Sequence, residues 1–181
     1  MKIKTAIILV SVLSTIFVSG CTNNYEPYKY AKNGIYYNEN IHLKFSYPTD
    51  WNFYYGYDPV PEMSLFSLVK DENKKELAFG MFNKTKYGVE NVSFESYKKY
   101  QLEVLSENDK IIIKNSTIIE SKGKEWFLLV TEYKYPWLTA SLAEIDCSDY
   151  IFIVSYKTST NHTFNLTPIM ESLECGEVSK P

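Results

Sequence analysis

Three cysteines are the side chains whose positions in this 181-residue sequence indicate chemistry most directly. The first, Cys21, ends a leader that begins with Lys2 and Lys4 and continues as an apolar run over residues 6–18. A positive start, a short apolar middle and small residues at the cut are the parts of an export signal. A membrane-spanning helix needs about 20 apolar residues, which this run does not reach. We therefore expect residues 1–20 to be a cleaved export signal.

The segment Val18-Ser19-Gly20-Cys21 resembles the lipobox of prokaryotic lipoproteins. The resemblance implies that the Cys21 sulfur receives a diacylglycerol and that Cys21 becomes the first residue of the mature chain. Two or more acyl chains hold a protein stably at a membrane, so we expect an exported domain anchored by lipid at the extracytoplasmic face. The alternative is an ordinary secretory signal that releases a soluble domain. Residues 21–33 are polar and predict a tether that reaches at most ~40 Å.

The other two cysteines, Cys147 and Cys175, can pair with each other once Cys21 is lipidated. An exported protein enters an oxidising compartment, where two remaining cysteines favour a disulfide. Closing the loop between them would stabilise the fold by roughly 3.5 kcal/mol through chain entropy. Two buried free thiols are an alternative, and a metal site is another. A metal would need more ligands, and His42 and His162 stand alone without ligand spacing.

The remaining polar residues form no recognisable catalytic constellation. The sequence has no Gly-x-Ser-x-Gly elbow, no Gly-rich phosphate loop and no His-Glu-x-x-His pair. His42 occupies the polar side of an alternating segment, and several aspartates fall in predicted turns, where local hydrogen bonding accounts for them. We expect neither an enzyme nor a cofactor or metal site, and an envelope hydrolase is the weakest alternative.

Aromatic side chains could bind a ligand by stacking. Tyr54, Tyr55 and Tyr57 follow Trp51 closely and lead into a loop with two prolines. Exposed aromatic clusters mark interfaces, so these three tyrosines predict a contact surface for a protein or a glycan. The alternative is that alternate members of the run face the core while the others cover the sheet.

Length and charge narrow the class of protein. The mature chain has the size of one domain, and 45% hydrophobic residues supply ample material for one core. Without the two leader lysines, 17 basic side chains stand against 22 acidic ones, a net charge of −5. All the basic residues are lysine, so the bidentate guanidinium used on phosphates and guanine is absent. We expect no nucleic-acid partner.

Hydrophobic periodicity predicts strands, a helix, more strands and a closing helix. Residues 41–47 alternate with period two, and Phe94, Tyr97, Tyr100 and Val104 recur at helical spacing after a cap at Asn91 or Ser93. A second helix begins near Thr167, with Thr167 as the cap and Pro168 in the first turn. The further predicted strands are 35–37, 51–55, 63–69, 77–82, 110–120, 125–133, 137–145 and 150–156. This order favours one mainly antiparallel sheet with helices packed on it.

The segment Phe45-Ser46-Tyr47-Pro48-Thr49-Asp50-Trp51 resembles the aromatic, x, Tyr-Pro, x, x, Trp segment of PsbP-related proteins. The order of elements over 34–175 is similar too. The resemblance implies an α+β domain over residues 34–176, a Mog1/PsbP-like α/β/α sandwich with a mainly antiparallel sheet flanked by helices, followed by a tail at 177–181. The best understood members bind proteins and carry out no covalent chemistry, but none of their contact residues can be placed here.

Together these observations predict a membrane-anchored cell-envelope lipoprotein. We expect it to bind a protein partner in the envelope or to assist assembly there. A small-molecule or glycan-binding lipoprotein is the alternative.

Overall fold

The computed structural model describes residues 27–54, 64–71, 75–134, 137–159 and 164–176. In chain order its elements are η1 (Pro27–Tyr30), β1 (Ala31–Lys32), β2 (Ile35–Asn38), η2 (Glu39–Ile41), β3 (Leu43–Ser46), β4 (Asn52–Phe53), β5 (Ser64–Lys70), β6 (Lys75–Asn83), α2 (Phe94–Ser106), β7 (Ile111–Ser121), β8 (Lys124–Lys134), β9 (Trp137–Asp146), β10 (Tyr150–Thr158), α3 (Thr167–Ser172) and β11 (Glu174–Cys175). Antiparallel strands with few helices confirm the predicted α+β class. No helix among these residues is long and apolar enough to cross a membrane.

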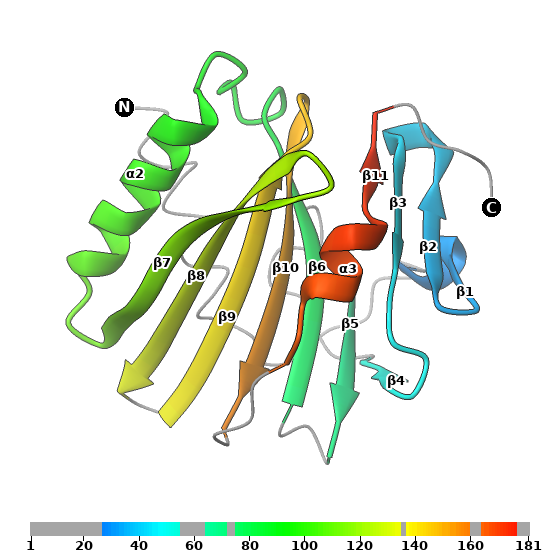
Figure 1. Ribbon diagram of the computed structural model, residues 1–181, viewed down its shortest axis with the longest axis horizontal. Coiled ribbons are helices and arrows are strands. Elements are labelled where there is room, and N and C mark those ends of the chain that lie inside the picture. The colour runs from blue at the N-terminus through cyan, green and yellow to red at the C-terminus, as the bar shows by residue number, and fades with distance from the viewer. Residues whose placement is uncertain (1–26, 55–63, 72–74, 135–136, 160–163, 177–181) are drawn as a thin grey trace.

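Seven strands form one antiparallel sheet in the order β4-β5-β6-β10-β9-β8-β7 (Figure 1). Strands β7 to β10 are joined in sequence as hairpins, so most neighbours in the sheet are neighbours in the chain. The β7–β8 turn has positive φ at Lys122 (50°) and Gly123 (72°). Positive φ at both central positions gives a turn whose twist matches the strands it joins, which places β7 beside β8.

A second, four-stranded sheet has the order β1-β2-β3-β11. The prediction of a single sheet is therefore wrong. The alternation over residues 41–47 is present, but β3 pairs with β2 and β11 instead of joining the large sheet. Alternation determines which side chains share a face, whereas the choice of partner strand depends on contacts that are distant in the chain.

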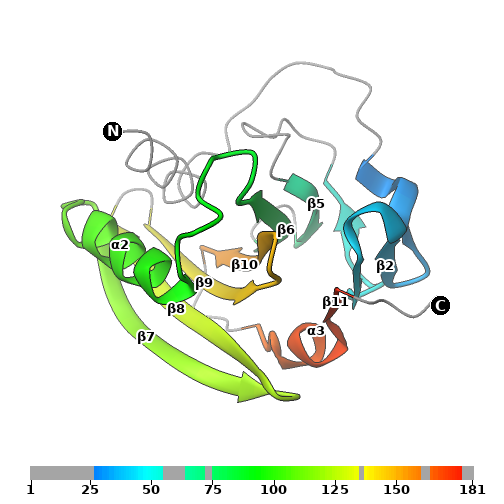
Figure 2. The same cartoon turned by 90° about the horizontal axis from the view of Figure 1, so that it is seen from above.

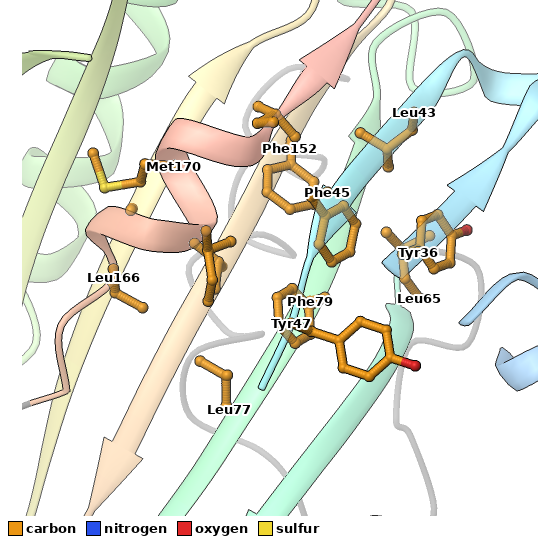
Figure 3. Close-up of a cluster of buried hydrophobic side chains, with 14 of the residues drawn as sticks. Tyr36, Leu43, Phe45, Tyr47, Leu65, Leu77, Phe79, Phe152, Leu166 and Met170 are labelled. Carbon is orange, nitrogen blue, oxygen red and sulfur yellow. The ribbon is translucent and has the colours of Figure 1, made fainter. Parts of the chain in front are cut away.

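The main core lies between the small sheet, α3 and one face of the large sheet (Figure 3). The Phe45 ring from the small sheet lies 4.9 Å from the rings of Phe79 and Phe152 in the large sheet, measured between centroids. Ile169 and Met170 of α3 are buried in the same cluster. Aromatic pairs of this kind add to simple area burial, so this cluster holds the two sheets together.

The helix α2 covers the opposite face of the large sheet (Figure 2). Ser93 caps it, as predicted, by accepting a hydrogen bond from the Ser96 amide at 3.1 Å. In β8 the successive residues Trp126 and Phe127 belong to different clusters, Trp126 to the main core and Phe127 to the cluster that includes Leu105 of α2. Because successive strand residues point to opposite faces, the large sheet is packed on both sides.

Two predicted boundaries need correction. Ala31 is buried and pairs with Tyr36, so the folded part begins inside the 21–33 segment assigned to the tether. Thr167 is the first residue of α3 and not its cap; the Asn165 side chain accepts the Thr167 amide hydrogen bond at 3.0 Å. Both predictions used only the polarity of neighbouring residues. Such polarity reveals neither the short pairing of β1 with β2 nor the hydrogen bond of the Asn165 side chain.

The predicted disulfide between Cys147 and Cys175 is present, with a Cα–Cα separation of 5.8 Å. Cys147 lies in the β9–β10 turn of the large sheet, and Cys175 ends β11 of the small sheet. The bond therefore connects the two sheets covalently.

Candidate functional site

An open groove lies between α2 and β7, on the face of the large sheet that α2 covers. Its volume is about 840 Å³. The apolar part of its lining comes from Leu102 of α2, Ile113 and Ile118 of β7 and Phe127 of β8. We call this feature the α2–β7 groove. A concave, mainly apolar surface with a few polar groups is the usual form of a binding site.

Charged side chains of both signs border the α2–β7 groove. Glu95, Lys98, Lys99 and Glu103 contribute from α2. The Lys98 ammonium is buried, forms an ion pair with Glu95 and lies 5.1 Å from the Phe94 ring centroid. Lys98 is thus held by α2 itself, whereas Lys99 and Glu103 are exposed. The border does not favour a strongly anionic or cationic ligand.

The strand β7 forms the outer wall of the groove and an edge of the large sheet. It pairs with β8, and no other described strand lies on its second side. The pairing skips Lys114 between Ile113 and Asn115, which is a β-bulge, and continues regularly from Asn115 to Ser121. An edge strand presents backbone N–H and C=O groups that can pair with another chain.

The exposed side chains of β7 reinforce this view of the edge. Residues 114–118 are all exposed. Ile118 keeps 47% of its surface accessible, and among the described residues it is the one large hydrophobic side chain that is exposed. The Lys114 ammonium contacts the Glu132 carboxylate of β8 at 2.7 Å. Bulges and lysines on edge strands discourage unspecific pairing, so the N-terminal end of the edge is protected and the segment from Asn115 onward is not.

A second polar cluster lies buried under α2. The Gln101 amide donates to the Glu144 carboxylate at 2.8 Å, and the Tyr97 ring lies next to it. Burial raises the pKa of Glu144 to about 7, although Gln101 and Tyr97 oppose the rise. The same burial, with the neighbouring Glu144, raises the pKa of Tyr97 well above its ordinary value. Among the described residues, Glu144 is the carboxyl group with the largest pKa shift.

The Glu144 cluster has no room for a substrate. The described hollow that adjoins it, beside Tyr97, measures about 10 Å³, less than most single waters need. Glu144 has no exposed surface, and its Oε2 has no hydrogen-bond partner within the described residues. A general acid or base must reach its substrate, so this cluster serves to dock α2 on β9.

The residues predicted from sequence lie elsewhere. Tyr54 is half-buried, and its amide donates to the Ser67 carbonyl at 2.9 Å. It follows β4, at the edge of the large sheet opposite β7. Tyr55, Tyr57, Cys21 and His162 lie outside the described residues. The tyrosine contact surface therefore stays a prediction, as does lipidation of Cys21.

Metal binding finds no support in the described part of the chain. No group of three or more histidine, cysteine, aspartate or glutamate side chains there could hold an ion. His42 is exposed at the end of η2, in a left-handed conformation with φ 49°. The α2–β7 groove was not anticipated, although the polar run Lys114-Asn115-Ser116-Thr117 within a strand was a signal for an exposed edge.

Comparison with known proteins shows similarity in structure only. No protein-family model matches the sequence, and no curated protein matches it. The solution structure of cyanobacterial PsbP from Synechocystis sp. is similar at a TM-score of 0.58 and 8% identity, covering 88% of this chain and 99% of that one. At such an identity the likeness concerns the fold, and it confirms the fold expected from the aromatic segment.

Two further solved structures resemble the chain more weakly. A Bacteroides thetaiotaomicron protein matches at a TM-score of 0.47 and 16% identity over 75% of this chain, which spans 45% of that protein's length. A Pseudomonas aeruginosa protein, described as of unknown function and a putative regulator, matches at 0.42 and 12% identity, covering 69% of this chain and 81% of that one.

Proposed function

We propose that this chain, which has a PsbP-like fold, is a lipid-anchored extracytoplasmic domain that binds protein without covalent chemistry. The observation that carries the proposal is the exposed β7 edge beside the α2–β7 groove. The leader and Cys21 support the location. The disulfide supports it as well, because disulfides persist mainly in oxidising compartments.

The β7 edge and the groove suit an extended polypeptide. A strand added beside β7 would bond to the outward backbone groups of Asn115 to Ser121, and this gives affinity. Alternate side chains of the added strand would point toward the side on which Ser116 and Ile118 line the groove. Leu102 and Phe127 would receive them, and this gives specificity.

Catalysis and glycan binding receive less support. The carboxyl group best suited to acid–base work, Glu144, is sealed beneath α2. Sugars are bound mainly by stacked aromatic rings and polar groups, whereas Phe127 is the one aromatic residue in the lining of the groove. The groove thus favours aliphatic side chains as its occupants.

The test is cross-linked capture from detergent-solubilised membranes, with tagged native protein beside three variants. Ile118→Asp places a charge at the centre of the edge and should reduce capture by tenfold or more. Glu171→Lys, an exposed change on α3 and on the opposite face, should leave it unchanged. Cys21→Ala should abolish both membrane attachment and capture.

Three results would overturn parts of this proposal. Unchanged capture by Ile118→Asp would exclude the β7 edge as the binding surface. A native protein that captures no protein at all would favour a small-molecule ligand. A native protein that is soluble and carries no lipid would exclude the anchor.

A further inference from the structure

We infer that the Cys147–Cys175 disulfide is a site of thiol–disulfide exchange, in which an incoming thiol attacks the Cys175 sulfur and Lys124 assists as a cation. The observation that carries this role is the contact between the Lys124 ammonium and the Cys175 sulfur, with an Nζ–Sγ distance of 3.8 Å. None of the three residues lines the α2–β7 groove, so the site goes beyond the proposed function and does not depend on it.

The fold brings Lys124 to the disulfide from the large sheet. Lys124 is the first residue of β8 and lies two residues before Trp126, a side chain of the main core. Both therefore point to the same face of the sheet. That end of the β7–β8 hairpin lies beside α3 and β11 (Figure 2). The Lys124 ammonium also donates to the Leu173 carbonyl at 3.3 Å, and this second contact holds it near the Cys175 sulfur.

The Lys124 ammonium is short of negative charge while the disulfide is intact. It is partly buried, and the two groups that it contacts among the described residues are a carbonyl and a disulfide sulfur, which carry no formal charge. Burial lowers the pKa of Lys124, against the attraction of the Glu174 carboxylate. Glu174 itself forms an ion pair with Lys44 at 3.0 Å. A thiolate at Cys175 would supply the missing charge, since an adjacent lysine stabilises a thiolate.

The two sulfurs differ in their surroundings. Cys175 is partly exposed at the end of β11, whereas Cys147 is buried in the main core. Apolar burial disfavours a charged thiolate. The titratable groups on the elements around the disulfide are Lys124 of β8, Lys44 of β3, His42 before β3, Glu171 of α3, Glu174 of β11, and Asp146, Asp149 and Tyr150 in and after the β9–β10 turn. Among the described residues, Lys124 is the cation in contact with a cysteine sulfur. Reduction should therefore give a thiolate at Cys175 and a protonated thiol at Cys147.

The exchange takes place in two displacements, with a dithiol as the reductant. One thiolate of the dithiol attacks the Cys175 sulfur, which forms a mixed disulfide and releases Cys147 as a thiolate that takes up a proton. The second thiolate of the dithiol attacks the reductant sulfur of the mixed disulfide, and Cys175 leaves as a thiolate beside Lys124. The dithiol loses two electrons and becomes a disulfide. Of its two protons, one ends on Cys147 and one in solvent. Stabilising the leaving thiolate speeds the second displacement.

The short strand β11 suits such a site. It pairs with β3 at two positions, Glu174 with Lys44 and Cys175 with Leu43. A two-residue pairing holds a strand only weakly once the covalent link is broken. Cys175 can then move toward the sulfur of an exchange partner.

The first test compares the two thiols of the reduced protein. The full chain in detergent is reduced with dithiothreitol, freed of it and labelled with iodoacetamide, and mass spectrometry of its peptides separates the cysteines. At pH 6.5, Cys175 should be labelled about tenfold faster than Cys147. Lys124→Met should slow labelling of Cys175 about tenfold at pH 6.5 but less than about twofold at pH 9.5, where ordinary thiols are ionised.

Two variants are matched controls for Lys124→Met. Lys124→Arg keeps the positive charge and should keep the native labelling rate. Lys122→Met removes an exposed lysine from the same hairpin and should also change nothing. Equal labelling of Cys147 and Cys175, as in a reduced chain that unfolds, would overturn the inference. So would a Lys124→Met variant with the native rate at Cys175.

The second test starts from the oxidised, folded protein. After brief exposure to reduced glutathione and an acid quench, the mixed disulfide should lie on Cys175 in about tenfold excess over Cys147. In glutathione buffers at pH 7, Lys124→Met should need about ten times more reducing conditions for half-reduction, expressed as the squared reduced over the oxidised concentration. An adduct mainly on Cys147, or an unchanged half-reduction point, would contradict the assigned roles.

A third test finds the source of the thiol in the cell. Cys147→Ser leaves Cys175 without its resolving thiol, so mixed disulfides with Cys175 should accumulate in membranes, and a variant with serine at both positions is the blank. An adduct on non-reducing gels would indicate a protein dithiol, and a glutathione-sized mass on Cys175 a small thiol. Either supports the site, whereas an unmodified Cys175 would overturn it. Ile118→Asp should leave these adducts unchanged, which separates this outcome from failure of the β7 edge.

Discussion

Replacing Glu144 by glutamine should change how the stability of the protein depends on pH. Burial raises the pKa of Glu144 from its ordinary 4.5 to about 7, so the folded state favours the neutral carboxyl. The stability that this group contributes is fully present below pH 4.5 and is lost as the pH rises through 7. At roughly 1.4 kcal/mol per pKa unit, the loss amounts to about 3 kcal/mol. A glutamine side chain at this position stays neutral throughout and would not show the loss.

The assay is urea unfolding of both proteins at several pH values from 4.5 to 8. The free energy of unfolding of Glu144→Gln minus that of the native protein should increase by about 3 kcal/mol across this range. Glu171→Gln removes an exposed carboxylate on α3 and serves as the control. A difference between Glu144→Gln and the native protein that stays constant with pH would refute the reasoning, because it would mean that Glu144 ionises alike in the folded and unfolded states.

Two further substitutions examine the contact between the sheets. Changing both Cys147 and Cys175 to alanine should lower the free energy of unfolding by about 3.5 kcal/mol, measured by urea unfolding, and an unchanged midpoint would contradict a connecting role. Phe45→Ala removes a fully buried ring between the two sheets and should cost about 3–5 kcal/mol. Ser46→Ala on the outer face of β3 is its control in thermal unfolding, and equal losses for the two would place Phe45 outside the core.

The α2–β7 groove and the buried Glu144 cluster could not be predicted from the sequence. Glu144 follows Ser141, Leu142 and Ala143 in a strand, where a charged side chain is ordinarily expected to face water. It is buried because α2, some 40 residues earlier, supplies Gln101 and Tyr97 over that face. Similarly, the sequence predicts a strand over residues 110–120, but the position of β7 at the edge depends on the order of all seven strands.

The sequence by itself determined the features that depend on neighbours in the chain. These are the hairpins, the Ser93 cap, the α2 face with Tyr97, and the tight turn at Lys122 and Gly123. Each is decided by periodicity, propensity or turn geometry within a few residues. The predicted export leader and the lipidation expected at Cys21 rest on the same kind of local signal, and they stay predictions.

Only the tertiary structure decided which surfaces remain open. The small sheet and α3 cover one face of the large sheet and α2 covers the other, and no strand of the described residues pairs with the outer side of β7. Whether a strand or a sheet face is exposed depends on which helices and strands pack against it, and these elements come from distant parts of the chain. That is the physical reason why the strands could be predicted from local sequence while the α2–β7 groove and its exposed Ile118 could not.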